Sequence, residues 1–180
     1  MTMQIDVQAN RKQRKYATSI QVARVAWALA APLFRYSPRP LWCWRRWLLR
    51  QFGAQVGQGV HIYPSVKITM PWHLKIGDMV AIGDGAILYA LGTITIDARA
   101  TVSQYAHLCA GSHDWRDPSR PLLMPPIFIG ADAWVCADAF VGPGVRIGAG
   151  AILGARAVAL VDLPAGHIGE GNPMQIRRQR

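Results

Sequence analysis

The sequence has few acidic residues, few cysteines and no long apolar run, and each shortage excludes a class of protein. Its three cysteines, Cys43, Cys109 and Cys136, lack the spacing of a metal site, so we expect reduced thiols and a cytoplasmic location rather than a disulfide scaffold. The apolar stretch over residues 22–34 contains Arg24 and is shorter than the ~20 residues of a membrane-spanning helix. No apolar run with a cleavage site opens the chain, so we expect no signal peptide.

Basic side chains outnumber acidic ones. The 180 residues include 20 Lys and Arg against 10 Asp and Glu, which gives a formal net charge of +10. Charge of this sign attracts phosphates of nucleic acid, of a membrane surface or of an anionic cofactor. Hydrophobic residues make up 51% of the chain and charged residues only 17%. This is the composition of a globular chain, long enough for one domain with its own core.

The chain opens with a basic arm and a helical segment. Residues 1–16 have the composition of a disordered arm, and residues 17–53 are expected to form helices. Apolar residues at helical spacing predict a first helix over residues 17–31. We expect Pro32 to end that helix, because proline interrupts helical hydrogen bonding.

A second helix is predicted over residues 41–52, with Pro40 placed to open it. It carries three tryptophans and three arginines: Trp42, Trp44, Trp47, Arg45, Arg46 and Arg50. Two interpretations stay open. The helices cap the open end of the domain that follows, or Trp and Arg anchor the chain among membrane headgroups. Both can hold on different helix faces.

From Val56 onward, aliphatic residues recur every six positions, with a slip of two residues after Leu74 and again after Ile94. These positions are Val56, Ile62, Ile68, Leu74, Ile76, Ile82, Leu88, Ile94, Ile96, Val102, Leu108, Ile129, Val135, Val141, Ile147 and Leu153. The period matches neither a helix nor a flat strand. Six residues fit a short strand and a corner, so three hexads close a coil of about 18 residues. Residues 54–180 are therefore predicted to form a parallel β-helix of hexapeptide repeats, all-β, with about five coils.

The repeat is interrupted once, between Leu108 and Ile129. We predict that residues 113–126 form a loop extruded at a corner, and that the tail, residues 165–180, can cap the last coil. The interruption contains His113. A repeat protein that places a histidine at its one break is expected to have its chemistry there.

Several motifs are more specific than the period. They are Pro71-Trp72-His73-Leu74-Lys75-Ile76-Gly77-Asp78, Leu88-Tyr89-Ala90-Leu91-Gly92, Val102-Ser103-Gln104, Leu108-Cys109-Ala110-Gly111-Ser112-His113-Asp114, Trp134 and Gly171-Asn172-Pro173. Together with the helical lead-in, they resemble the colanic acid biosynthesis acetyltransferases, a family of left-handed β-helix acyltransferases. The resemblance covers nearly the whole chain beyond the arm. It implies a homotrimer with sites between subunits, acetyl-CoA as donor, and a sugar hydroxyl of an exopolysaccharide or other glycan as acceptor.

Acetyl transfer to a hydroxyl needs a base that takes the hydroxyl proton. Histidine suits this task near neutral pH, so His113 is the predicted general base. Asp114 is the candidate to orient it. Successive residues of a strand point to opposite faces, so whether Asp114 reaches the imidazole stays open. Trp115 either packs under the loop or stacks on the substrate.

The resemblance also implies contacts to both substrates. The predicted acceptor contacts are Asp84, Tyr89, Ser103, Gln104 and Trp115. The predicted acetyl-CoA contacts are Trp134, Ala137, Ala155, Arg156, Pro173 and Arg178. Two positions depart from the family pattern. Ala90 stands where many relatives have Asn, and Val161 stands where many have a Lys that approaches the CoA phosphates. Arg156 and Arg178 are the candidates to replace that cation.

A zinc-dependent enzyme of the carbonic anhydrase type is one alternative, because some relatives with this fold hold zinc with three histidines. Here the candidates are His73, His107 and His113. The hexad count assigns His107 to the second hexad of a coil, His113 to the third, and His73 to a coil two turns earlier, so we expect no metal site within one subunit.

A non-catalytic scaffold or nucleic-acid binder is the other alternative. Much of the basic charge lies in the arm, the second helix and the tail rather than along one groove, so we expect no nucleic-acid partner. The distribution fits peripheral contact with the inner face of a membrane. An acceptor such as a lipid-linked oligosaccharide would be found there.

Overall fold

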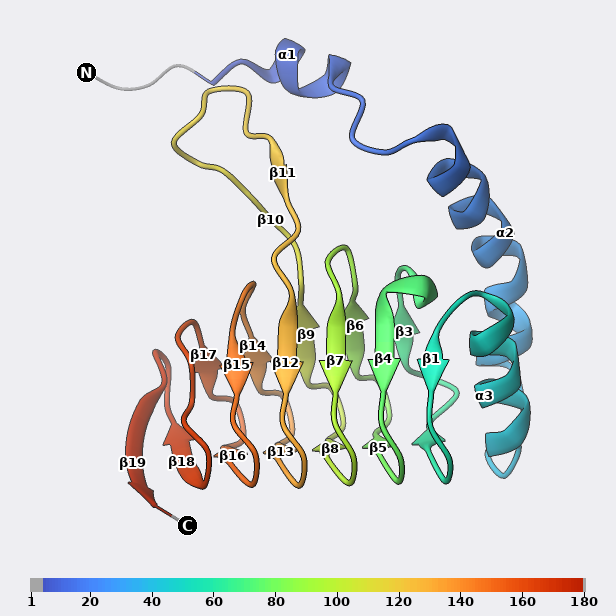
Figure 1. The fold of residues 1–180 in the computed structure, drawn as a ribbon. Coiled ribbons are helices and arrows are strands. Elements are labelled where there is room, and N and C mark those ends of the chain that lie inside the picture. The colour runs from blue at the N-terminus through green and yellow to red at the C-terminus, as the bar shows by residue number, and fades with distance from the viewer. Residues whose placement is uncertain (1–4, 180) are drawn as a thin grey trace.

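Residues 5–179, described by the computed structural model, form a β-helix with a helical lead-in and one protruding hairpin (Figure 1). The first sheet contains β1 (Gln55–Val56), β4 (Leu74–Ile76), β7 (Ile94–Ile96), β12 (Ile127–Ile129) and β15 (Arg146–Ile147). The second contains β2 (His61–Ile62), β5 (Ala81–Ile82), β8 (Thr101–Val102), β13 (Trp134–Val135), β16 (Ile152–Leu153), β18 (His167–Glu170) and β19 (Gln175–Gln179). The third contains β3 (Lys67–Ile68), β6 (Ile87–Tyr89), β9 (His107–Cys109), β14 (Phe140–Val141) and β17 (Val158–Ala159).

Each coil takes one strand from each sheet. Successive coils pair parallel and in register, so that Ile76 lies between Val56 and Ile96 in the first sheet. The third sheet has five strands, and β18 with the bridge at Leu163 begins a further turn. The structure thus has five complete coils and a partial sixth, which confirms the predicted β-helix of hexapeptide repeats.

The repeated aliphatic positions fill the interior of the prism. Ile82 and Val102 are fully buried, as is the small residue Ala106 four positions after the latter. Coils stack so closely that a Cβ added to Gly77 would lie 2.6 Å from the backbone nitrogen of Ala98. At Gly77 the stacking distance therefore requires a glycine.

The lead-in contains α1 (Val7–Lys12), α2 (Thr18–Arg35) and α3 (Trp42–Gln51). Two predictions were wrong here. Disorder was expected throughout residues 1–16, but residues 7–12 are helical; residues 1–4 lie outside the described residues. Pro32 was expected to end the first helix, yet α2 continues through it. The continuation buries Phe34, whose ring packs edge-on against Trp27 at 6.3 Å, so packing outweighs the hydrogen bond that proline loses.

Arginines of α3 cap the first coil. Unpaired carbonyls at the edge of a sheet are normally covered or hydrated. The guanidinium of Arg50 donates to the Val56 carbonyl at 2.6 Å, and that of Arg46 donates to the Val60 carbonyl at 2.9 Å. Arg45, which is fully buried, continues the series along the coil. These contacts support the interpretation of the helices as a cap.

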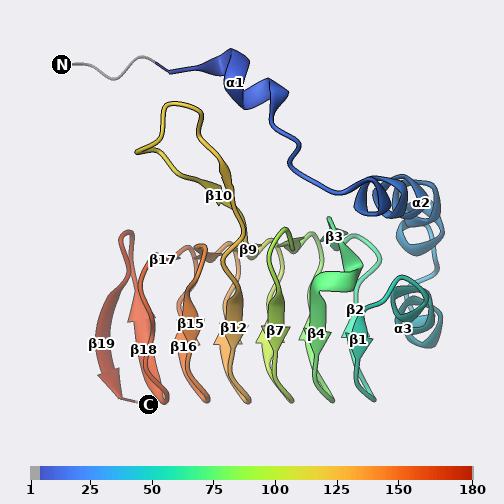
Figure 2. The same ribbon diagram turned by 45° about the horizontal axis from the view of Figure 1, so that its top comes forward.

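The other end of the β-helix is covered by the tail. β19 pairs antiparallel with β18 and lies outside it (Figures 1 and 2). Figure 2 also shows α2 and α3 beside the first coils, while α1 lies over the hairpin. Among helices of residues 5–179, none combines the length and apolar character needed to cross a membrane.

Candidate active site

The interruption folds as a hairpin that leaves one corner of the β-helix. β10 (Ser112–His113) and β11 (Leu122–Leu123) pair antiparallel, with His113 opposite Leu122. The chain leaves after β9 and returns at β12, the first strand of the next coil. The excursion therefore removes no strand from the stack, as the sequence predicts. The predicted start at residue 113 is slightly late, since the hairpin begins at Ser112.

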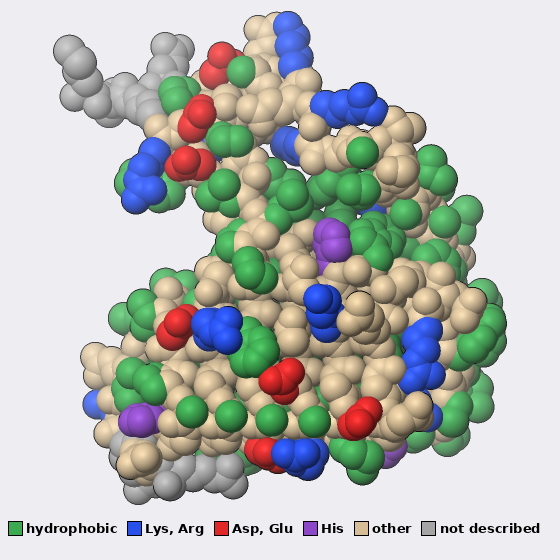
Figure 3. All heavy atoms as spheres, viewed as in Figure 1, with side chains coloured by type: hydrophobic (Ala, Val, Ile, Leu, Met, Phe, Trp, Pro, Cys, Tyr) green, Lys and Arg blue, Asp and Glu red, His purple; other side chains and the backbone are tan. Residues whose placement is uncertain are grey.

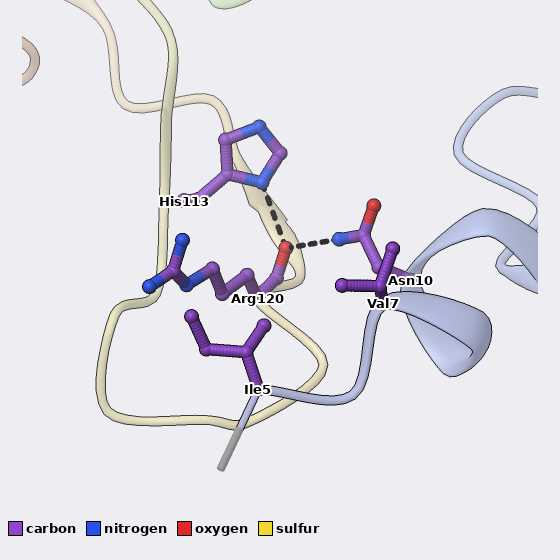
Figure 4. A pocket seen from close by; sticks show the side chains of 5 residues that line it. All are labelled: Ile5, Val7, Asn10, His113 and Arg120. Carbon is purple, nitrogen blue, oxygen red and sulfur yellow. Dashed lines mark hydrogen bonds between the residues drawn. The ribbon is translucent and has the colours of Figure 1, made fainter. Parts of the chain in front are cut away.

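One ring nitrogen of His113 is hydrogen-bonded to the backbone, and the other can meet a substrate. Its Nδ1 lies 2.7 Å from the backbone carbonyl oxygen of Arg120 (Figure 4). A carbonyl oxygen can only accept, so Nδ1 carries the hydrogen. In the neutral ring, Nε2 then keeps its lone pair and can accept a proton. The side chain is exposed, which leaves this nitrogen open to a substrate.

Asp114 does not orient the imidazole. Its Oδ1 accepts from the backbone N–H of Arg116 at 2.9 Å, which closes a local turn. The orienting group is instead the Arg120 carbonyl. Sequence reasoning missed it, because a backbone carbonyl belongs to every residue and has no signature in the sequence.

Two hollows flank His113. One is lined by hairpin residues together with late-coil residues: Ser112, His113, Asp114, Trp115, Arg116, Leu123, Pro125, Gly142, Pro143 and Leu160. The other lies between the hairpin and the N-terminal segment and is lined by Ile5, Val7, Asn10, His113 and Arg120 (Figure 4). Of the predicted site residues, Asp114 and Trp115 thus lie in one hollow with His113.

Three predicted acceptor contacts lie at a different corner. Asp84, Ser103 and Gln104 line a hollow between the second and third sheets. Trp134 reaches the same corner, because its indole N–H donates to the Ser103 hydroxyl at 2.8 Å. Within one chain, His113 lines a different hollow from these residues.

Tyr89 lies on the third sheet, where its ring packs edge-on against His107 at 6.5 Å. It is also close to Gly111, at the foot of the hairpin. Of the predicted acceptor contacts outside the hairpin, Tyr89 is therefore the one placed next to the chain segment that leads to His113.

The predicted acetyl-CoA contacts lie along the late coils. The backbone N–H of Arg156 donates to the Ala137 carbonyl at 2.9 Å, so these two residues share a corner. The Arg156 side chain is exposed, with its Nε 3.8 Å from an Asp138 carboxylate oxygen. Ala155, the residue before Arg156, is also exposed. Pro173 follows a cis peptide bond, and the Arg178 side chain lies outside the described atoms.

The three histidines considered for zinc are separate. Among residues 5–179, no group of three or more His, Cys, Asp or Glu side chains is arranged to hold a metal ion. The hexad count was wrong about two of them: His107 lies in β9, the third strand of its coil, and His113 lies on the hairpin. His73 bonds the Ala90 carbonyl at 3.0 Å. Burial lowers the pKa of His107, whose Nε2 is buried without a hydrogen-bond partner.

The β-helix of stacked hexads is the fold of the hexapeptide-repeat acetyltransferases. The fold is shared with galactoside acetyltransferase in complex with coenzyme A (TM-score 0.85, 21% identity, 99% of this chain and 91% of that chain). It is also shared with the acetyltransferase VCA0836 of Vibrio cholerae O1 biovar eltor complexed with acetyl-CoA (TM-score 0.83, 22% identity, 91% and 90%). The β-helices of this class are left-handed.

The particular family follows from sequence. The chain is 47% identical over 154 residues to WcaF, named as the colanic acid biosynthesis acetyltransferase of Escherichia coli (strain K12), covering 86% of this chain and 85% of WcaF. The WcaF of Shigella flexneri matches with the same figures. The chain therefore belongs to the colanic acid biosynthesis acetyltransferase family, which confirms the resemblance seen in its motifs. No protein-family profile matches the chain.

Proposed function

We propose that this acetyltransferase moves the acetyl group of acetyl-CoA to a sugar hydroxyl in exopolysaccharide or other glycan biosynthesis, with His113 as general base. The observation that supports it is the bond between His113 Nδ1 and the Arg120 carbonyl, which leaves Nε2 unprotonated in an open hollow. Family membership supplies the donor and the acceptor class.

The reaction follows from that geometry. His113 Nε2 takes the proton of the sugar hydroxyl as its oxygen attacks the thioester carbonyl carbon. A carbon–oxygen bond forms and a tetrahedral oxyanion results, which needs a hydrogen-bond donor nearby. The oxyanion collapses, the carbon–sulfur bond breaks, and the CoA sulfur leaves and takes the proton from the imidazolium. The products are the O-acetyl sugar and CoA, and the histidine returns to its starting state.

We propose that the site is completed in a homotrimer. In one chain, His113 lies at one corner of the β-helix and lines one hollow. Ser103, with Trp134 bonded to it, lies at another corner, beside a different hollow. Packing three β-helices side by side would place one corner of each subunit against a different corner of its neighbour. The acceptor and CoA contacts of one chain would then face His113 of the next, with the pantetheine beside Trp134, Ala137 and Ala155.

Subunit mixing tests this arrangement. His113→Ala and Trp134→Ala proteins are each expected to be weakly active. Trimers assembled from both contain sites with neither substitution, so co-refolded mixtures should regain a substantial fraction of wild-type turnover. Mixtures no more active than the average of the two variants would show that each site belongs to one chain.

We propose that α2 is the part of the chain that contacts the membrane. Its outward face is a continuous apolar stripe of Val22, Val25, Leu29 and Leu33, which are 58% to 77% exposed. Figure 3 shows green hydrophobic side chains along the edge where Figure 1 places this helix. Residues 1–52 contain ten Lys and Arg and one acidic residue, while residues 53–180 contain ten and nine. An apolar stripe within a basic segment suits the surface of an anionic bilayer, where lipid-linked acceptors are found.

Vesicle binding tests the membrane contact. The chain is expected to bind vesicles that contain phosphatidylglycerol and not pure phosphatidylcholine, and Leu29→Glu should weaken binding at least tenfold, since burying a leucine is worth about 1.5–3 kcal/mol. Val161→Glu is the control, because Val161 is 61% exposed on the β-helix itself. Unchanged binding by Leu29→Glu, or loss of the oligomer instead of vesicle binding, would show that the stripe has another occupant.

The central test is acetyl-CoA turnover with a panel of sugar acceptors. His113→Ala should lower kcat by about 10²–10⁴-fold, the usual contribution of a general base. His167→Ala is the matched control, because His167 also bonds a backbone carbonyl through Nδ1, at 2.8 Å from Ala165, but lies on β18. Equal turnover in both variants would refute the role of His113.

A further inference from the structure

The N-terminal segment holds the tip of the catalytic hairpin. The backbone N–H of Asp6 donates to the Pro118 carbonyl at 3.0 Å, and the Gln13 side-chain amide donates to the Ser119 hydroxyl at 2.9 Å. α1 lies between these two contacts, above the hairpin (Figures 1 and 2). We call residues 5–13 the N-terminal strap. It joins parts of the chain that are more than one hundred residues apart.

The central contact of the strap is made by Asn10. Its Nδ2 donates to two consecutive carbonyls, that of Ser119 at 2.6 Å and that of Arg120 at 2.9 Å. Its other amide atom, Oδ1, accepts from the Lys15 ammonium at 3.1 Å, which sets the direction of the amide. The Arg120 oxygen is the same atom that accepts from His113 Nδ1 (Figure 4). One oxygen thus links the strap to the proposed base.

That oxygen needs an external support. Arg120 lies at the hairpin tip with φ +47, a left-handed conformation that is rarely adopted by residues other than glycine. The hairpin is exposed and has only two paired residues in each strand. A carbonyl in such a segment can rotate away unless something holds it, and the Asn10 amide supplies a second hydrogen bond to it.

The strap does little for the stability of the domain. None of the residues of α1 is buried. Its contacts are hydrogen bonds to the hairpin rather than packing against the β-helix core. A segment that contributes little to the core yet bonds the oxygen behind His113 points to a role in the reaction.

We propose that Asn10 is a positioning residue: it fixes the Arg120 carbonyl, which holds His113 as the Nδ1–H tautomer with Nε2 directed at the acceptor. This rests on the proposed function of His113. The strap also forms the apolar wall of the hollow on that side, through Ile5 and Val7. Loss of the Asn10 amide should therefore affect the chemical step rather than the binding of acetyl-CoA.

Steady-state kinetics test the role of Asn10. Asn10→Ala should lower kcat about fivefold with the KM for acetyl-CoA unchanged, which corresponds to one hydrogen bond of about 1 kcal/mol. Asn10→Asp keeps the volume but turns a carboxylate toward two carbonyls, so its kcat should fall further. Gln13→Ala is the matched control, since it removes the bond of the same strap to the Ser119 hydroxyl without touching the Arg120 carbonyl, and its kcat should stay within twofold.

A spectroscopic readout separates this inference from the proposed function. In ¹H–¹⁵N spectra of the unliganded protein at a pH where the ring is neutral, His113 should show a protonated Nδ1, and Asn10→Ala should move both ring nitrogens toward the average of two tautomers. Wild-type His113 signals in Asn10→Ala, or equal kcat in Asn10→Ala and Gln13→Ala, would overturn the role of Asn10. Full activity of His113→Ala would overturn the proposed function instead, and the spectra would still decide whether Asn10 sets the tautomer.

Discussion

Replacing Arg45 by methionine should destabilise the cap of the first coil. The guanidinium is fully buried, and its partners are three carbonyls and a hydroxyl. Nε donates to Ile62 at 2.6 Å, Nη2 donates to Arg39 at 2.6 Å, and Nη1 donates to Pro38 at 2.9 Å and to the Ser37 hydroxyl at 2.8 Å. Methionine keeps much of the volume and satisfies none of these acceptors.

The magnitude follows from those acceptors. The Ile62 carbonyl, which lies in a buried hydrogen bond, costs about 1–3 kcal/mol when it is left without a donor. The carbonyls of Pro38 and Arg39 lie in part-buried bonds and cost less each, because water can reach them. Removing the buried charge returns several kcal/mol, because its desolvation no longer opposes folding. The net loss in the free energy of unfolding should be about 1–3 kcal/mol. Arg45→Lys keeps the charge but cannot reach all four acceptors, and should lose about half as much.

Urea denaturation at a fixed subunit concentration measures this loss. Tryptophan fluorescence reports on the cap directly, because Trp42 lies under the guanidinium at 4.7 Å and stacks on His61 at 4.5 Å. Arg35→Met is the control, an exposed arginine of α2 that should change the free energy of unfolding by less than about 0.5 kcal/mol. If Arg45→Met were no less stable than Arg35→Met, the carbonyls of the first coil would not depend on the arginine.

Three further outcomes follow from other contacts. Gly77→Ala should cost about 2–3 kcal/mol in urea denaturation, because its Cβ would lie 2.6 Å from backbone of the next coil, whereas Gly150→Ala, at φ +64 with nothing within 4 Å, should cost only about 1 kcal/mol. Burial lowers the pKa of His107 below its usual 6.5, so near that pH the unfolded chain binds more protons than the folded chain. The free energy of unfolding should therefore fall as the pH drops. In melting curves at pH 7.5 and 5.5, the melting temperature of His107→Phe should fall less than that of the wild type. Burial raises the pKa of the Cys136 thiol, so iodoacetamide should modify exposed Cys43 first at pH 7.5, as mass spectrometry can follow.

The β-helix could be predicted from sequence because its constraint repeats. Every coil must place a small or aliphatic side chain into the same narrow prism, and some close approaches between coils require a glycine, as at Gly77. The position of the hairpin followed from the same repeat, since an excursion that preserves register shows as a single gap between hexads.

The parts that could not be predicted depend on backbone atoms or on distant partners. The strap is a short helix with no buried face, and the atoms that Asn10 bonds are carbonyls of residues 119 and 120. The inward turn of Arg45 likewise depends on carbonyls exposed by the first coil. In composition the arm is basic and polar, so the sequence alone favoured a disordered arm, and for the second helix it left a cap and a membrane anchor both open.

The pairing of β12 with β7 does not depend on the hairpin, so the hairpin can move separately from the β-helix. β12 pairs with β7 residue for residue, so that Ile127 lies opposite Ile94 although the chain has left and returned in between. The hairpin can open, and the strap can detach, without breaking a single rung of the stack. Hydrogen exchange should therefore be fast in β10 and β11 and slow in β9 and β12. The hairpin that contains the proposed base is therefore expected to move on its own timescale while the paired coils stay rigid.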